Sequence, residues 1–166
     1  MATTITLKGN EVHTVGTLPA VGTTIRDFAL VDSGLNVKTL ENFEGKKKIF
    51  NIFPSVDTPV CAASARTFNE KASALDNTVV INVSRDLPFA LGRFCAAEGL
   101  DQVETLSDFR SSFGDDYEVT IADSVFKGLL SRAVIVADEN NKVVYTEQVS
   151  EIADEPNYEA ALSAVK

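Results

Sequence analysis

The spacing of apolar residues changes several times along the chain, and each change predicts an element. Residues 4–8 and 12–15 alternate between apolar and polar around Gly9-Asn10-Glu11, which predicts an N-terminal β-hairpin. Residues 49–53 and 78–84 are nearly continuous apolar runs, typical of strands that are covered on both faces. Residues 133–137 form a third strongly β-prone run, and residues 142–149 are its expected hairpin partner.

Helical spacing appears between these strands. Ala65, Phe68, Ala72 and Leu75 predict a helix over residues 62–75. A second helix is expected through Leu87, Leu91, Phe94 and Cys95, with Gly99 as its stop. Shorter elements are a strand at 28–31, a helical turn at 39–43, a weak strand at 103–106, a short helix at 108–113, and a final helix opened by Pro156.

The predicted order is strand, helix, strand, helix, hairpin and terminal helix. A βαβ unit followed by ββα is the layout of an α/β thioredoxin-like sandwich, in which a mixed central sheet carries helices on both faces. No repeat or linker divides the sequence, so we expect one domain over residues 1–166. Sites in such sheets collect beyond the carboxyl ends of the parallel strands, and Cys61 falls at that edge.

Composition narrows the function classes. The net charge of −9 argues against nucleic acid or an anionic membrane as the main partner. The Lys46-Lys47-Lys48 run is the one basic cluster and is expected to be a solvated turn before a strand. No apolar stretch is long enough for a membrane span, and the N-terminus lacks the features of a signal peptide, so a cytoplasmic protein is expected. Two cysteines in such a protein are more typical of redox chemistry than of a structural staple.

Cys61 is the candidate working group. Thr58 suits the N-cap of the following helix and Pro59 suits its first position, so Cys61 takes the third position, where a capping acid often sits. The helix N-terminus favours an anion there by roughly 0.3–1 kcal/mol. Free thiols titrate near pH ~8.5, and ionising one at neutral pH requires roughly 2.7 kcal/mol. A cation from elsewhere is therefore needed. Cys61 could alternatively be a small buried residue that does not react.

Arg132 is a candidate for that cation, because it directly precedes the strand 133–137. If that strand lies beside residues 49–53, Arg132 could face the cysteine loop. On spacing alone, a solvated charge at a strand end is the better explanation of Arg132. Cys95 shares a helical face with apolar neighbours and could be a buried structural residue. A disulfide with Cys61 would require Cα atoms within roughly 7 Å, and hence local unwinding of a helix that Pro88 and Gly92 already weaken.

Other chemistries fit poorly. Cys61 is followed by Ala62-Ala63-Ser64, so the chain has no Cys-x-x-Cys motif. Two cysteines and one histidine are too few for a typical zinc site. A Cys-His hydrolase would need His13, which lies in the predicted hairpin and is expected to be a surface residue. No glycine-rich phosphate loop follows a strand.

The motifs do match a known family. Pro54-x-x-x-Thr58-x-x-Cys61 resembles the active-site signature of peroxiredoxins. The wider stretches 53–61, 84–90 with 93–95, and 129–133 resemble the bacterial thiol peroxidase subfamily, which is the atypical two-cysteine type. The predicted hairpin also suits that subfamily, and the resemblance covers essentially the whole chain.

The resemblance implies a function and a site. Cys61 would be the peroxidatic cysteine that is oxidised by hydroperoxides, and Cys95 would resolve it through an intramolecular disulfide that thioredoxin reduces. Thr58 and Arg132 would assist the thiolate and the peroxide, and Pro54 would shield the site. The resemblance implies a homodimer without metal or organic cofactor, and a preference for alkyl hydroperoxides. The alternatives are a thioredoxin-like disulfide exchanger or redox sensor, and a non-catalytic binding module with inert cysteines.

Overall fold

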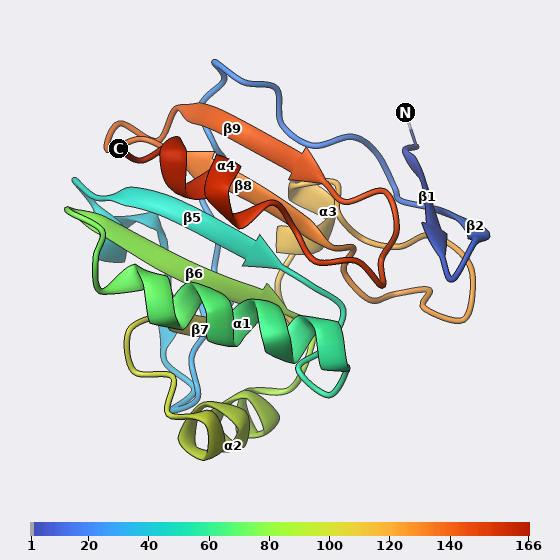
Figure 1. Cartoon of the computed structure of the whole chain (residues 1–166), viewed down its shortest axis with the longest axis horizontal. Helices are drawn as coiled ribbons and strands as arrows, with labels where there is room; N and C mark the ends of the chain where they lie inside the picture. Colours follow the sequence, from blue (N-terminus) through green and yellow to red (C-terminus); the bar gives the residue numbers. More distant parts are fainter. Residues whose placement is uncertain (1) are drawn as a thin grey trace.

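The structure is a computed structural model that describes residues 2–166. Its centre is a seven-stranded mixed sheet in the order β4-β3-β7-β6-β5-β8-β9, and a separate hairpin, β1-β2, lies at one end of the molecule (Figure 1). The strands are β1 (Thr4–Leu7), β2 (Asn10–His13), β3 (Leu30–Val31), β4 (Val37–Lys38), β5 (Lys47–Ile52), β6 (Thr78–Ser84), β7 (Glu104–Ser107), β8 (Ala133–Ala137) and β9 (Val143–Gln148). The helices are η1 (Leu40–Phe43), α1 (Pro59–Ala72), α2 (Pro88–Glu98), α3 (Phe113–Asp116) and α4 (Tyr158–Ser163).

Parallel and antiparallel pairing meet at β5. It runs parallel to β6 and antiparallel to β8, and Ile52 pairs with Ala133 at the end of the β5–β8 ladder. The carboxyl end of β5 and the start of β8 therefore share one edge of the sheet. That edge also receives the N-terminus of α1, which follows β5 in the chain (Figure 1).

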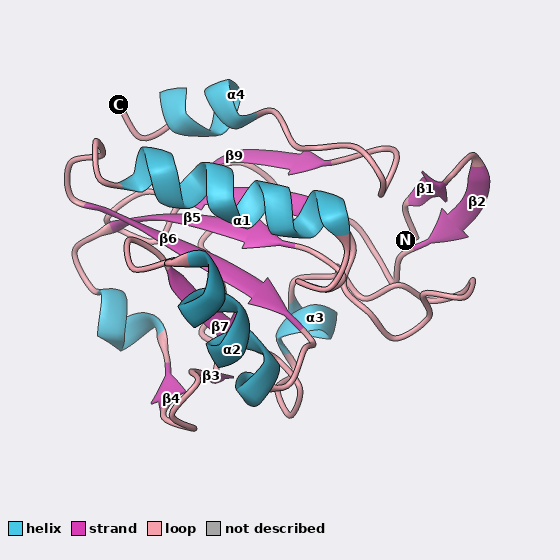
Figure 2. Cartoon of the chain, turned by 60° about the horizontal axis from the view of Figure 1, so that its bottom comes forward, coloured by secondary structure: helices cyan, strands magenta, loops and turns pink. Residues whose placement is uncertain are grey.

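Helices cover both faces of the sheet, as predicted. Figure 2 shows α1 and α4 on the same side, where Phe68 and Leu162 pack with Ile49, Val80 and Val136. The other face is filled by an aromatic cluster of Phe28, Phe43, Phe50, Phe113 and Tyr117, which brings η1 and α3 against the sheet. The alternating thioredoxin-like layout inferred from the apolar runs is thus confirmed.

Several local predictions were wrong. The hairpin turn consists of Lys8 and Gly9, both with positive φ, so β2 begins at Asn10 rather than Val12. The third helix is Phe113–Asp116 and not 108–113, because the stacking of Phe113 on Tyr117, with ring centroids 4.2 Å apart, sets its position. The final helix begins after Pro156, since the Asn157 side chain accepts a hydrogen bond from Ala160 N and forms the N-cap.

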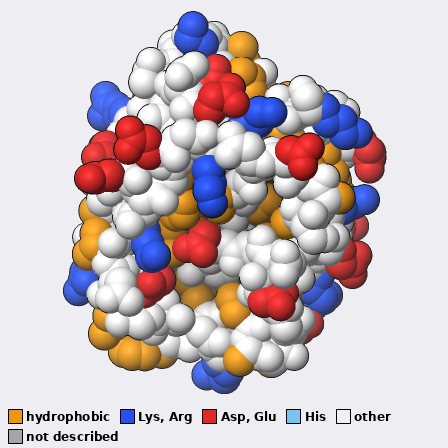
Figure 3. Space-filling model, turned by 90° about the vertical axis from the view of Figure 1, so that its left-hand side faces the viewer, with side chains coloured by type: hydrophobic (Ala, Val, Ile, Leu, Met, Phe, Trp, Pro, Cys, Tyr) orange, Lys and Arg blue, Asp and Glu red, His pale blue; other side chains and the backbone are white. Residues whose placement is uncertain are grey.

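The basic run was also assigned incorrectly. Lys47 and Lys48 belong to β5, and Lys48 is fully buried. Its Nζ donates to the carbonyl of Lys46 at 2.7 Å, and burial lowers its pKa. Acidic and basic side chains are interspersed on the face shown in Figure 3, the end of the molecule away from the hairpin. Within residues 2–166, no helix combines the length and apolar character needed to cross a bilayer.

Candidate active site

Cys61 occupies the third position of α1, as the capping pattern predicted. Thr58 is the N-cap and Pro59 the first helical residue. The Thr58 hydroxyl, however, donates to the carbonyl of Ser55 at 2.9 Å, and no side-chain oxygen of the described chain caps the helix. The first N–H groups of α1 thus remain available to an anionic sulfur or oxygen.

Arg132 reaches Cys61 from the neighbouring strand. Its Nη2 lies 3.1 Å from Cys61 Sγ, and its Nε donates to the carbonyl of Ile152 at 2.6 Å. The Arg132 side chain is buried, and Nη1 has no hydrogen-bond partner among the described residues. An unpaired guanidinium N–H in the interior is costly. It is also a donor that a small polar ligand beside the sulfur can use.

A cavity of about 320 Å³ adjoins this pair. Its lining comes from the hairpin, the loop before α1, the start of α1 and the segment after β9. The lining residues are Leu7, Lys8, Pro54, Thr58, Pro59, Val60, Phe126, Arg132, Ile152 and Ala153. Cys61 has an exposed fraction of 0% and is not among them. A reactant in the cavity can therefore contact Arg132, whereas the Cys61 sulfur bonded to Arg132 is covered.

The hairpin is fastened to the segment that holds Arg132. Glu151 accepts hydrogen bonds from Thr6 Oγ1 at 3.0 Å, Gly9 N at 2.9 Å and Ala153 N at 2.8 Å. These donors, chiefly the Ala153 N–H, lower the pKa of Glu151 to about 2. The next residue, Ile152, supplies the carbonyl that accepts from Arg132. The segment 151–153 thus connects the β1-β2 hairpin, which lines the cavity, to the Arg132 guanidinium.

Asp86 fixes the loop that leads to Cys61. It follows β6 and accepts hydrogen bonds from Ser55 Oγ at 2.7 Å, Val56 N at 2.9 Å and Ser84 Oγ at 2.6 Å. The loop between β5 and α1 is therefore tied to the adjacent parallel strand. This places Pro54, which is buried, in the wall of the cavity.

Cys95 lies on α2, apart from the Arg132 cavity. Both cysteines are free thiols, Cys61 buried and Cys95 partly buried. Burial raises the pKa of Cys95, which is the ordinary effect of desolvating a thiolate. Leu91 and Phe94 of α2 pack beside Cys61 and Phe53 in a small apolar cluster. Leu87, expected on that buried face, is the exposed N-cap instead.

The structure thus brings together four of the five predicted site residues. Arg132 bonds to Cys61, while Thr58 and Pro54 line the adjoining cavity; Cys95 stands outside this group. Sequence reasoning missed Asp86 and Glu151 as anchors, although an acid two positions after the strand 78–84 was a signal for the first. His13 is half-buried and its Nδ1 lies 2.7 Å from Asp123 Oδ2, so it joins the hairpin to the loop before β8.

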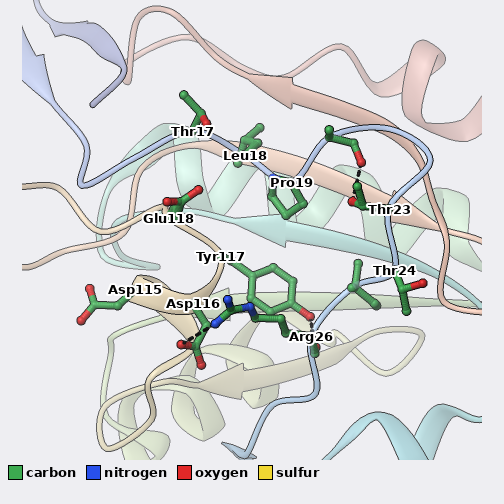
Figure 4. A pocket seen from close by; sticks show the side chains of 12 residues that line it. Thr17, Leu18, Pro19, Thr23, Thr24, Arg26, Asp115, Asp116, Tyr117 and Glu118 are labelled. Carbon is green, nitrogen blue, oxygen red and sulfur yellow. Dashed lines mark hydrogen bonds and ion pairs between the residues drawn. The ribbon is translucent and has the colours of Figure 1, made fainter. Parts of the chain in front are cut away.

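A second cavity, of about 450 Å³, lies between the segment before β3 and α3 (Figure 4). Arg26 and Asp116 form an ion pair of 3.6 Å in its wall, and the Tyr117 hydroxyl donates to the Arg26 carbonyl. Neither cysteine lines it. The Arg132–Cys61 pair therefore lies outside this second cavity.

Comparison with known proteins identifies the family of this chain. The family model described as Redoxin matches residues 20–162, which is most of the chain. The chain belongs to the redoxin family. This redoxin is 54% identical over 158 residues to the thiol peroxidase of Corynebacterium glutamicum, covering 95% of this chain and 96% of the relative. It is 56% identical over 161 residues to the thiol peroxidase of Mycobacterium tuberculosis, covering 97% of each chain.

Solved structures place the redoxin in the same group. A peroxiredoxin-like protein from Aquifex aeolicus superposes with a TM-score of 0.93 at 36% identity, covering 99% of this chain and 96% of the other. A thiol peroxidase from Chromobacterium violaceum gives a TM-score of 0.88 at 26% identity, covering 95% and 91%. The resemblance inferred from the motifs around Cys61, Cys95 and Arg132 is confirmed at the level of the family.

Proposed function

We propose that this redoxin is a thiol-dependent peroxidase in which Cys61 is oxidised by a hydroperoxide and Cys95 resolves the product. The observation that carries the proposal is the 3.1 Å contact of Arg132 with Cys61, in a buried position beside a cavity. A disulfide exchanger would need its sulfur at the surface to meet a protein thiol. Complete burial of Cys61 favours a small reactant instead.

The first step needs an anionic sulfur and a cation at the oxygen. The Cys61 thiolate attacks one oxygen of the hydroperoxide, the O–O bond breaks, and the other oxygen leaves with a proton as alcohol or water. Sulfur gains the attacked oxygen as a sulfenic acid and loses two electrons. Arg132 Nη2 stabilises the thiolate, and the unpartnered Nη1 is a donor for the charge that develops on the leaving oxygen.

The second step joins the two cysteines. The Cys95 sulfur attacks the Cys61 sulfenic acid, an S–S bond forms, and the S–O bond breaks with release of water. The reductant that closes the cycle is a dithiol protein of the thioredoxin type, which returns two electrons by disulfide exchange. Cys95 sits on α2 and outside the cavity, and we expect part of α2 to unwind before the bond forms.

Two substitutions test this assignment. Cys61→Ser is expected to abolish peroxide consumption, because the nucleophile is gone. Cys95→Ser should consume about one peroxide per chain, forming a sulfenic acid that a dimedone-type reagent traps, and should then stop turning over with thioredoxin. Turnover by the Cys61→Ser variant would exclude the mechanism, whereas full turnover by Cys95→Ser would exclude only the resolving role.

Quaternary structure and location follow the family resemblance. The proposal includes a homodimer in the cytoplasm, a substrate range that includes alkyl hydroperoxides and hydrogen peroxide, and no metal or organic cofactor. The apolar lining from Leu7, Val60 and Phe126 supports an alkyl group on the substrate. Sedimentation equilibrium at micromolar protein tests the dimer, and a monomer at every concentration would contradict it.

A further inference from the structure

A partly buried ion pair stands outside the cavity beside Arg132. Arg85 follows β6, and its guanidinium donates two parallel hydrogen bonds to Asp108, from Nε to Oδ1 and from Nη2 to Oδ2, each 3.0 Å long. The Asp108 side chain has an exposed fraction of 0%, and that of Arg85 is 30% exposed. Neither residue lines the Arg132 cavity, so neither touches a reactant there.

The segment before β8 forms a short ladder that ends at Arg132. Residues 119–121 lie antiparallel to residues 129–131, with a bridge between Thr120 and Leu130. The backbone hydrogen bonds of the ladder run from Ile121 N to the Leu129 carbonyl, from Ser131 N to the Val119 carbonyl and from Gly128 N to the Ile121 carbonyl, at 2.8, 2.8 and 2.9 Å. Arg132 is the next residue, so the place of this ladder helps to fix where its side chain begins.

The ion pair holds both strands of this ladder. Arg85 Nη1 donates to the carbonyl of Gly128 at 2.6 Å, directly before the second strand. Asp108 Oδ2 accepts from Gly114 N at 3.2 Å, and the Gly114 carbonyl accepts from Val119 N of the first strand at 2.8 Å. All three guanidinium nitrogens of Arg85 are therefore engaged, two by the carboxylate and one by the ladder.

Gly114 shows how closely the pair packs against the ladder. A Cβ atom at this position would lie 2.6 Å from Arg85 Nη2, 2.6 Å from Thr120 Oγ1 and 2.7 Å from Leu130 Cδ2. These distances are far shorter than van der Waals contact, so a side chain at residue 114 would displace its neighbours. The guanidinium and the two strands therefore converge on one glycine.

Stability alone is a weak reason for such a pair. Burial raises the pKa of Asp108, and the hydrogen bonds from Arg85 oppose that rise. Replacing a buried ion pair with apolar residues of similar volume is often neutral or stabilising. An apolar pair could not, however, supply the rigid fork by which two nitrogens bind a carboxylate while the third is aimed at a carbonyl.

Arg85 and Asp86 are consecutive residues that hold the two halves of the site. Asp86 ties the loop that leads to Cys61, and Arg85 ties the ladder that leads to Arg132. We propose that Arg85, oriented by Asp108, is a positioning residue that holds Arg132 at the Cys61 sulfur. It deepens the proposed function and rests on it, because the step that Arg132 assists is the reaction with peroxide.

Arg85→Lys tests this role, because lysine keeps a positive charge beside Asp108 but lacks the three directed nitrogens. The second-order rate constant with peroxide should fall by roughly three- to ten-fold, below the ~10² that a misplacement of about 1 Å can cost. The effect is partial because the Arg132 carbonyl also accepts from Val149 N at 3.0 Å and Gln148 Nε2 at 2.9 Å.

Two companion variants complete the set. Asp108→Asn breaks the same fork from the other side and should slow the reaction with peroxide by a similar factor, which keeps the test valid if Arg85→Lys does not fold. Arg110→Lys is the matched control. Arg110 is exposed, lies two residues after Asp108 and stacks over the Phe109 ring, so its variant should react at the wild-type rate.

The Arg132→Met background shows whether Arg85 acts through Arg132. In that background Arg85→Lys should change the rate by less than about two-fold, because no guanidinium is left to position. A general loosening of the fold would instead slow the reaction by the same factor in both backgrounds.

Proton–nitrogen NMR of the reduced protein supplies a readout without peroxide. The Arg132 Nε–H, which donates to the Ile152 carbonyl, is identified by its loss in Arg132→Met. Its resonance should move in Arg85→Lys and in Asp108→Asn, and should keep its place in Arg110→Lys.

The outcomes separate the two proposals. If the wild-type protein consumes no peroxide, the proposed function fails, and the NMR comparison still decides whether Arg85 positions Arg132. If the wild type is active, an unchanged rate in Arg85→Lys or an unmoved Arg132 resonance would refute the positioning role alone. Equal slowing in the native and Arg132→Met backgrounds would also refute it, since Arg85 would then act on the fold and not through Arg132.

Discussion

Replacing Arg132 with methionine removes the guanidinium that is bonded to Cys61 and keeps most of the side-chain volume. In the native protein Nη2 lies 3.1 Å from Sγ, and the side chain is buried, so water does not screen the contact strongly. The substitution also frees the Ile152 carbonyl, which accepts from Nε at 2.6 Å. Both the thiolate and the leaving oxygen lose a cationic donor.

The size of the effect follows from these contacts. A hydrogen bond to a charged group contributes about 1.5–3 kcal/mol, and each ~1.36 kcal/mol corresponds to a tenfold change. Loss of the Nη2–Sγ contact alone therefore predicts roughly a 10- to 150-fold slower reaction. Removing a donor to a developing oxyanion typically costs about 10²–10³ in rate. We expect the second-order rate constant with peroxide to fall by roughly 10²- to 10³-fold.

Stopped-flow oxidation of the reduced protein measures this rate directly. Stability should change little, because the buried guanidinium carries its own desolvation cost and an unpaired Nη1. Arg26→Met is the matched control: Arg26 is largely exposed, pairs with Asp116 and does not line the Arg132 cavity, so its rate should equal that of the wild type. A Cys61 oxidation rate in Arg132→Met within a factor of three of the wild type would refute the reasoning.

Two further predictions concern the anchors of the site. Asp86→Asn weakens the charge-assisted hydrogen bonds from Ser55 and Val56. We therefore expect urea unfolding to show about 1–2 kcal/mol lower stability, and the reaction with peroxide to be several-fold slower. An unchanged rate in a measurably destabilised variant would contradict the anchoring role. Glu151 has its folded pKa lowered from 4.5 to about 2, so its contribution to stability is present above pH 4.5 and is lost as pH falls towards 2. The difference in unfolding free energy between wild type and Glu151→Gln should accordingly shrink over that range. Screening by water keeps this difference modest. A difference that grows on acidification would contradict the lowered pKa of Glu151.

The central architecture was predictable because its signals are local. The apolar runs that became β5, β6 and β8 are buried on both faces, and such runs are hard to mistake. Thr58 and Pro59 mark the start of α1, and Gly99 in the left-handed conformation ends α2. These elements alone place Cys61 at the correct edge of the sheet.

The elements that were predicted wrongly or missed depend on tertiary contacts or are too short to show a pattern. Lys48 is buried in β5 because its ammonium reaches back to the Lys46 carbonyl, and no residue pattern reports that contact. The position of α3 is set by aromatic packing between Phe113 and Tyr117 against the sheet. The short strand β4 was missed, since two residues paired with β3 leave no periodicity to detect.

The residues of the site also differ in how far the sequence could predict them. Arg132 could be suggested as a partner of Cys61 on the condition that two strands are neighbours, and the β5–β8 ladder meets that condition. Glu151 could not be found, because its partners in the hairpin lie more than 140 positions away.

The central claim is that one hydroperoxide converts Cys61 and Cys95 into a disulfide within a single chain. Stoichiometric titration of the reduced protein with peroxide, followed by mapping of the linked peptides, tests it most directly. We predict that one equivalent of peroxide removes both free thiols and yields a Cys61–Cys95 cross-link in a monomeric band on a non-reducing gel. Recovery of an unmodified Cys61, or of cross-links between chains only, would contradict the account.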